Sequence, residues 1–120
     1  MLPHLFLSDF EWSLYLDNTV TLKVDPKEIY TRYAKQSSSL VAFNHPWRDC
    51  AYAEGEEVIR MGYDEESRVR EQLDFYKSLG FPERYGLIAG TFLLRHHLDD
   101  DLVELSEVWL NHVLRFSKRD

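Results

Sequence analysis

The pattern of hydrophobic and polar residues changes period along the chain, which indicates elements of two kinds. Apolar residues that run together or alternate predict strands at Trp12–Asp17, Thr19–Val24 and Ser39–Phe43. The segment Tyr85–His97 is also apolar and β-prone, and it contains two glycines. Elsewhere apolar residues recur at helical spacing. The chain is therefore expected to alternate between strands and helices.

Capping residues indicate where the first two helices begin and end. Asp25 and Pro26 predict the start of the first helix, which we expect to fray by the Ser37–Ser39 run. A second helix is predicted from about Cys50 to Met61, closed by Gly62.

The two remaining helices are predicted in the same way. The third runs from a cap at Asp64 to Gly80, and the fourth begins after a cap at Asp99. The fourth helix is expected to carry one apolar face, formed by Leu102, Leu105, Trp109, Val113 and Phe116.

Strands that alternate with helices favour an α/β fold with a mixed sheet flanked by helices. The chain has 120 residues, which suits one domain over residues 1–120. In such layered sheets, ligands gather at the carboxyl ends of strands. That rule selects three polar places: Asp17, the loop Asn44–Cys50 and the segment Arg95–His97.

Composition narrows the classes of function. The net charge of -7 and the pI near 5.2 argue against nucleic acid as a partner, because the basic residues are scattered among acids. The single cysteine, Cys50, cannot form an internal disulfide. Residues 1–10 lack a basic start and no long apolar run follows, so neither a signal peptide nor a membrane segment is expected. We therefore expect a cytoplasmic protein.

Asp17 follows a predicted buried strand and has two interpretations. A carboxylate fixed at a strand end can bind a divalent cation held by a diphosphate, or accept hydrogen bonds from a ribose. Alternatively, Asp17 and Asn18 form the turn of a hairpin, because short polar side chains tolerate positive φ.

The loop NHPWRDC concentrates several kinds of polar group. Asn44, His45, Arg48 and Asp49 combine an amide, an imidazole, a bidentate anion binder and a carboxylate, which suits a phosphorylated or polyhydroxyl ligand. Trp47 can stack on a sugar or a base. The alternative is a proline-containing loop in which Asp49 caps the following helix and Arg48 is exposed.

Other candidate residues carry weaker signals. Cys50 is interpreted as a small packed residue, with a reactive thiol at a helix start as the alternative. Arg95 and His96 can contact an anion or a metal, although adjacent residues of a strand point to opposite faces. Most acids of the two central helices read as solvated surface, and Glu54 is retained because it lies one turn from the polar loop.

The ordered blocks WSLYLDNTVTLKVDP, FNHPWRDCAYAEGEEVI, EQLDFYKSLGFPERYGLI, LLRHH and VWLNHVLRFSKRD carry a resemblance over nearly the whole chain. The chain resembles the glycosyltransferase-like domain family that includes plant mucilage-related probable hexosyltransferases and a plant protein described as an alkaline ceramidase. HPWRDCAYAE is similar to the most recognisable block of that family. The resemblance implies hexose transfer from a nucleotide-sugar to a carbohydrate or other hydroxyl acceptor.

The resemblance also implies a partial GT-A-like fold, because the chain is similar to the C-terminal part of the family's domain and is expected to lack the part that holds the donor's base. An open sheet edge then favours self-association. The implied roles fall into three sets: general base or hydroxyl binding for Asp49 and Glu54, donor binding for Asp17, Asn18, Arg48 and Arg95, and binding of manganese or magnesium for Asp17, His45 and His96.

Two other classes of function remain as alternatives. A truncated fold can serve as a non-catalytic carbohydrate-binding or interaction module, because function resides in sites and part of this one is expected to be absent. The ceramidase description suggests a hydrolase of amide lipids, but the sequence shows no nucleophile or metal triad for that reaction.

Overall fold

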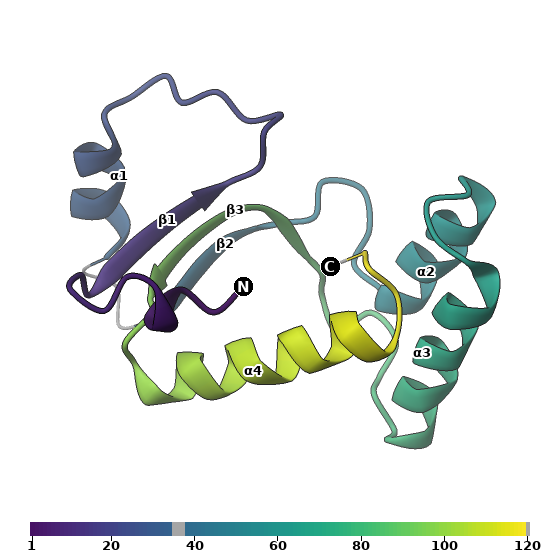
Figure 1. Ribbon diagram of the computed structural model, residues 1–120. Coiled ribbons are helices and arrows are strands. Elements are labelled where there is room, and N and C mark those ends of the chain that lie inside the picture. Colours follow the sequence, from purple (N-terminus) through teal and green to yellow (C-terminus); the bar gives the residue numbers. More distant parts are fainter. Residues whose placement is uncertain (35–37, 120) are drawn as a thin grey trace. The chain divides into compact units, whose positions relative to one another are not determined.

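The structure is a computed structural model that describes residues 1–34 and 38–119 (Figure 1). It divides into two compact units: residues 1–43 with 89–108, and residues 44–88 with 109–120. Helix α4, Asp100–Arg115, contributes to both units. The expectation of one domain over residues 1–120 stays a prediction.

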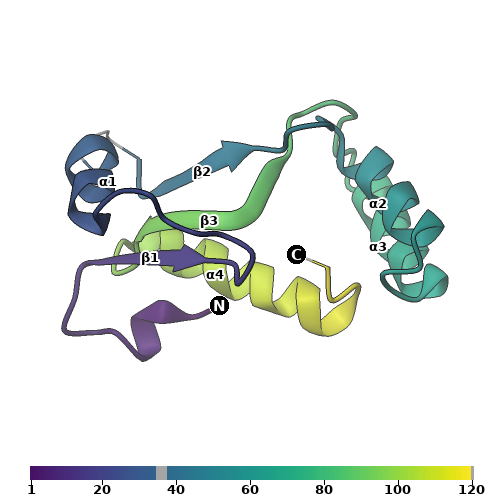
Figure 2. The ribbon, with the colours of Figure 1, turned by 90° about the horizontal axis from the view of Figure 1, so that it is seen from above.

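A three-stranded sheet organises the first unit, in the order β1-β3-β2. Strands β1, Trp12–Leu16, and β3, Ile88–His96, pair antiparallel, with Trp12 opposite His96 and Leu16 opposite Phe92. Strand β2, Leu40–Asn44, also runs opposite to β3, as Figure 2 shows. The α/β class is confirmed, but the sheet is antiparallel where a mixed sheet was expected.

The core of the first unit lies between the sheet and α1, Pro26–Tyr33. Ile29 of α1 packs with Phe92 and Leu94 of β3, and partly buried side chains of β1 surround them. The predicted helix start is confirmed, because the Asp25 carboxylate accepts a hydrogen bond from Lys27 N at 2.7 Å. The fraying that was expected by Ser37–Ser39 falls partly outside the described residues, because Ser37 is not among them.

Strand alternation places other side chains on the opposite face of the sheet. Ser13 and Tyr15 of β1 share this face with Leu93 and Arg95 of β3, because the two pairs lie directly across the ladder. Figure 1 shows the first half of α4 on the side of the sheet away from α1. Just beyond β3, His97 is 1% exposed and its ring Nε2 lies 3.0 Å from the carbonyl oxygen of Leu7, which follows the short helix Pro3–Leu5.

The second unit is built on a helix pair, α2, Ala51–Arg60, and α3, Glu66–Ser78, which lie side by side in Figures 1 and 2. Their shared core is formed by Cys50, Tyr52, Val58, Val69 and Leu73. Gly62 and Gly80 follow the two helices with φ of 65° and 73°, which glycine adopts without a steric penalty. Both predicted helix ends are thus confirmed.

Helix α4 begins as predicted, since the Asp99 carboxylate accepts a hydrogen bond from Leu102 N at 3.3 Å. The predicted apolar face is partly wrong. Leu102 and Phe116 are buried, but Leu105 is 45% exposed, and Ser106 takes a buried position instead.

Two other local predictions are wrong. Residues 19–24 form no strand: Val20 N donates to the Asp17 carbonyl at 2.9 Å, so the chain turns, and Val24 is 50% exposed. Leu22 nevertheless packs on the first core, which explains the apolar pattern. Helix α3 has Glu65 as its N-cap, because the carboxylate of Asp64 binds the C-terminal segment.

Candidate functional site

The loop between β2 and α2 brings three predicted site residues together within the second unit. Arg48 Nε pairs with Glu54 Oε2, and both side chains are about a quarter exposed, at 27% and 28%. His45 Nε2 lies 3.7 Å from the same carboxylate oxygen. Residues 44–50 together with Glu54 are called the polar loop below.

Backbone contacts fix the ring of His45. Its Nδ1 accepts a hydrogen bond from Arg48 N at 3.0 Å, and Trp47 N lies 3.4 Å from the same atom. Because Nδ1 acts as the acceptor, a neutral ring carries its proton on Nε2, which faces Glu54. In this arrangement neither ring nitrogen of His45 offers a lone pair to a metal ion.

Trp47 is the most exposed large side chain of the polar loop, at 81%. Its ring meets that of His45 edge to face, with centroids 5.9 Å apart. An exposed indole held next to polar groups offers an apolar face on which a sugar or a base can stack.

The other residues of the polar loop are held through their backbones. His45 N donates to the Leu87 carbonyl at 2.7 Å, and Gly86 N donates to the Asp49 carbonyl at 2.9 Å. The alternative in which Asp49 caps α2 is wrong, because Cys50 is the N-cap residue. The exposed side chains of Asn44 and Asp49 make no hydrogen bond within residues 1–34 and 38–119.

Cys50 is a packed residue, as predicted, with 9% of its surface exposed in the core of the helix pair. Hydrogen bonds from the backbone, that of Arg84 first, lower the pKa of its thiol, while burial acts in the opposite direction. Arg84 is in the left-handed region, with φ of 55°. The thiol lies inside the core of the pair.

Asp17 and Asn18 follow β1 in the first unit. Asp17 N donates to the Thr91 carbonyl at 2.9 Å, and its carboxylate lies 3.4 Å from Thr19 N. The hairpin interpretation is wrong, since no second strand follows, although Asp17 does open a turn. Asn18 is exposed.

Arg95 and His96 lie at the opposite end of the β1–β3 ladder from Asp17. His96 pairs with Trp12 at the start of β1, and its ring stacks on the indole with centroids 5.0 Å apart. About 16 Å of strand therefore separates His96 from Asp17. The rule that ligands gather at the carboxyl ends of strands assumes parallel strands. Because β1 and β3 are antiparallel, their carboxyl ends lie at opposite ends of the ladder, so Asp17 and His96 are far apart.

The sequence predicts a metal set of Asp17, His45 and His96. In the described ranges, no group of three or more His, Cys, Asp and Glu side chains is positioned to hold a metal ion. Metal binding by Asp17, His45 and His96 stays a prediction.

Sequence reasoning missed Ser13 and gave His97 no role, although it had selected the segment Arg95–His97. Each has a buried side-chain atom without a hydrogen-bond partner in the described part of the chain. Both residues lie in sequence blocks that carry the family resemblance, but no spacing of chemical groups marked either of them. The signal that could have found them is the alternation of side chains between the two faces of a strand, which places residues paired across two strands on the same face.

A chain of α/β class whose polar loop joins an arginine–carboxylate pair to an exposed tryptophan has the groups that proteins use to bind sugars and phosphates. The chain belongs to the family described as TOD1/MUCI70, glycosyltransferase-like domain, whose family model matches residues 1–120. The resemblance seen in the ordered sequence blocks is thus confirmed.

One curated relative is similar to the chain, the probable hexosyltransferase MUCI70 of Arabidopsis thaliana. The two are 27% identical over 129 residues, and the alignment covers 100% of this chain and 22% of the relative's length. No solved structure shows a significant match. Among the helices that the structure describes, none is both long and apolar enough to cross a membrane.

Proposed function

We propose that the chain contributes the polar loop to a hexosyltransferase site, where the loop binds the diphosphate and sugar of a nucleotide-sugar donor. The observation that carries this proposal is the Arg48–Glu54 pair beside His45 and the exposed Trp47. The family and the relative's description support the reaction class. A GT-A-like fold is proposed on the resemblance alone.

Arg48 is the group we assign to the donor's diphosphate. Glu54 holds the guanidinium through Nε, which leaves the two terminal nitrogens for phosphate oxygens. Glu54 also moderates the positive charge, so the loop can be partly buried without a ligand. Arg48 would thereby stabilise the charge that develops on the leaving diphosphate.

The transfer itself requires a base near the acceptor. The acceptor hydroxyl oxygen forms a bond to the anomeric carbon, the bond from that carbon to the diphosphate oxygen breaks, and the nucleoside diphosphate leaves with the electron pair. We assign the released proton to the exposed carboxylate of Asp49, because Glu54 is already paired with Arg48. Trp47 would stack on the donor.

A divalent metal, manganese or magnesium, stays a proposal for this chain, and none of the steps described depends on it. Asp17 stands alone at the end of β1, with Thr19 where a second acid would strengthen a metal site. The assay below includes manganese for this reason.

Calorimetric titration with a panel of UDP- and GDP-sugars, with and without manganese, tests the proposal. We expect at least one donor to bind, and Arg48→Met to weaken it about tenfold or more, as expected for a hydrogen bond between charged groups. Arg60→Met is the matched control, because Arg60 makes a similar pair with Glu57 on the exposed side of α2. Equal loss in both variants, or unchanged binding in Arg48→Met, would contradict the assignment.

A carbohydrate-binding role without catalysis is the second candidate, favoured by the separation of Asp17 from Arg95 and His96 along the ladder. Release of UDP or GDP from the same donors distinguishes the two functions. Binding without release over background supports the binding role, whereas release that depends on Asp49 supports transfer.

A further inference from the structure

The first unit contains four buried polar side-chain atoms that have no hydrogen-bond partner in residues 1–34 and 38–119. They are His4 Nδ1, Ser13 Oγ, Arg95 Nε and His97 Nδ1. Buried polar groups are nearly always paired, because an unpaired group retains the cost of leaving water. An unpaired cluster therefore calls for a ligand or ordered water.

Two of these atoms belong to residues that lie directly opposite each other. Ser13 of β1 and Arg95 of β3 are register partners, so their Cβ atoms are about 5 Å apart on one face of the sheet. Just beyond the end of the ladder, His97 N donates to the Glu11 carbonyl at 3.0 Å, and the alternation of side chains brings His97 to the same face. A cation, a hydroxyl and an imidazole thus follow one another along this face.

The charge of Arg95 is not balanced by an acid in the described residues. Arg95 is half-buried and takes part in no ion pair there, although Glu11 lies on the adjoining stretch of chain. Its guanidinium carbon lies 5.9 Å from the centre of the Tyr15 ring. Burial lowers the pKa of Arg95, which reflects the cost of keeping this charge out of water.

The same face is accessible at one end. Tyr15 on the edge strand is 43% exposed, whereas His97 at the other end is 1% exposed. Arg95 lies between them, so a small ligand can approach along Tyr15 and reach the guanidinium.

We propose that Arg95 and Ser13, flanked by Tyr15, form a binding site for a small oxyanion, a phosphate or a carboxylate group. An oxyanion would balance the arginine charge, accept from Arg95 Nε and from the Ser13 hydroxyl, and so satisfy two of the unpaired atoms. The site is independent of the polar loop, where Arg48 already has the carboxylate partner that Arg95 lacks. The net charge of -7 opposes unspecific anion binding, so a response to anions has to come from a local site.

Thermal unfolding of the 120-residue chain followed by circular dichroism tests this site. Inorganic phosphate and acetate are compared with chloride at matched ionic strength, which separates the phosphate source from the carboxylate source. A ligand at ten times its Kd should raise Tm by about 5 °C. The rise should be absent in Arg95→Met and persist in Arg32→Met, which replaces an exposed arginine of the same unit.

Without added anion, Arg95→Met should melt at the same or a higher temperature than the wild type, because a methionine removes an unpaired charge. Ser13→Val keeps the strand and removes the hydroxyl, so it should weaken the anion about three- to tenfold. No rise with either oxyanion beyond chloride, or an unchanged rise in Arg95→Met, would overturn the proposal. If Arg95→Met fails to fold, unchanged anion affinity in Ser13→Val overturns it instead.

Discussion

The Glu54 carboxylate, on the first turn of α2, pairs with the guanidinium of Arg48 in the preceding loop. The same oxygen lies 3.7 Å from His45 Nε2. One carboxylate therefore organises both basic groups of the polar loop, and its charge competes with any anion that Arg48 binds.

Glu54→Gln should strengthen the binding of inorganic pyrophosphate to the polar loop about three- to tenfold, because the amide keeps an acceptor for Arg48 Nε but removes the competing charge. Calorimetric titration measures the change. Glu66→Gln, which removes the charge from the exposed Arg70 pair of α3, should leave the affinity unchanged. Weaker binding in Glu54→Gln alone would mean that the carboxylate charge is needed to position Arg48.

Trp47→Ala should change the free energy of unfolding by less than about 0.5 kcal/mol, because the side chain is 81% exposed. The same substitution should lower the affinity for a nucleotide-sugar about three- to tenfold, which is the contribution expected from one stacked aromatic ring. Urea denaturation and calorimetric titration measure the two effects. A large loss of stability with unchanged binding would assign Trp47 a structural role.

Gly55 of α2 faces Leu73 of α3, and a methyl group on Gly55 would lie 2.8 Å from Leu73 Cδ1. Gly55→Ala should therefore lower the free energy of unfolding by about 1–2 kcal/mol, since overpacking outweighs the gain in helix propensity. In a Leu73→Ala background the same change should be neutral or stabilising. Equal effects of Gly55→Ala in both backgrounds, measured by urea denaturation, would contradict this packing.

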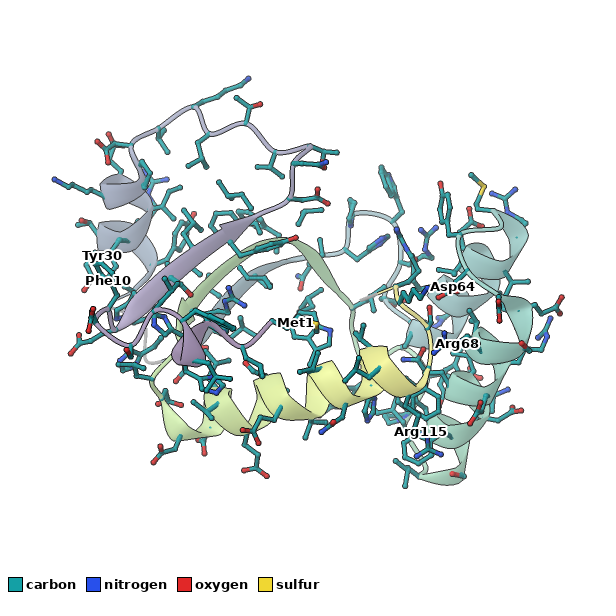
Figure 3. All side chains as sticks on the ribbon, in the orientation of Figure 1. Met1, Phe10, Tyr30, Asp64, Arg68 and Arg115 are labelled. Atoms are coloured by element: carbon teal, nitrogen blue, oxygen red, sulfur yellow. The ribbon has the colours of Figure 1, made fainter. Side chains whose placement is uncertain are left out.

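Asp64 joins the start of α3 to the C-terminal segment, and Figure 3 labels it near Arg68. Its carboxylate accepts hydrogen bonds from Lys118 N at 2.7 Å and the Ser117 hydroxyl at 2.8 Å. The backbone of Lys118 is the main cause of the lowered pKa of Asp64. The carboxylate thus stabilises the fold above its unfolded pKa of about 3.9, and this contribution is lost as the pH falls through the folded pKa.

Asp64→Asn should therefore lower the free energy of unfolding by about 1–2 kcal/mol at pH 7. The difference from the wild type should shrink as the pH falls below about 4, where the wild-type carboxylate also becomes neutral. Urea denaturation at several pH values measures it. A difference that is constant with pH would show that the charge of Asp64 has no part in this contact.

Local sequence signals predicted most helices and strands, because the start and end of such an element depend mainly on residues close by in the chain. Asp25 with Pro26, Gly62 and Asp99 mark helix ends whose hydrogen bonds or φ angles the structure confirms. Asp64 was wrongly predicted to cap α3, because its carboxylate binds a segment far away in the sequence. Leu105 was wrongly predicted to be buried, because helical spacing does not determine which residues a neighbouring element covers.

The candidate site was only partly predictable, for a topological reason. His45, Arg48 and Glu54 lie within ten residues of each other along the chain, so short spacing was sufficient to group them. Asp17 and His96 required the direction of β3 relative to β1, which the sequence does not specify. The same pairing placed Ser13 opposite Arg95.

Donor binding by the polar loop is tested most directly by a map of amide and indole chemical shifts, recorded by NMR while UDP-glucose, UDP-galactose or GDP-mannose is added to the ¹⁵N-labelled chain. The proposed role of the polar loop predicts that the largest shifts fall on residues 44–50, Glu54 and the Trp47 indole, and that Arg48→Met abolishes them. Saturable shifts confined to other residues, or none with any of the three donors at millimolar concentration, would contradict it.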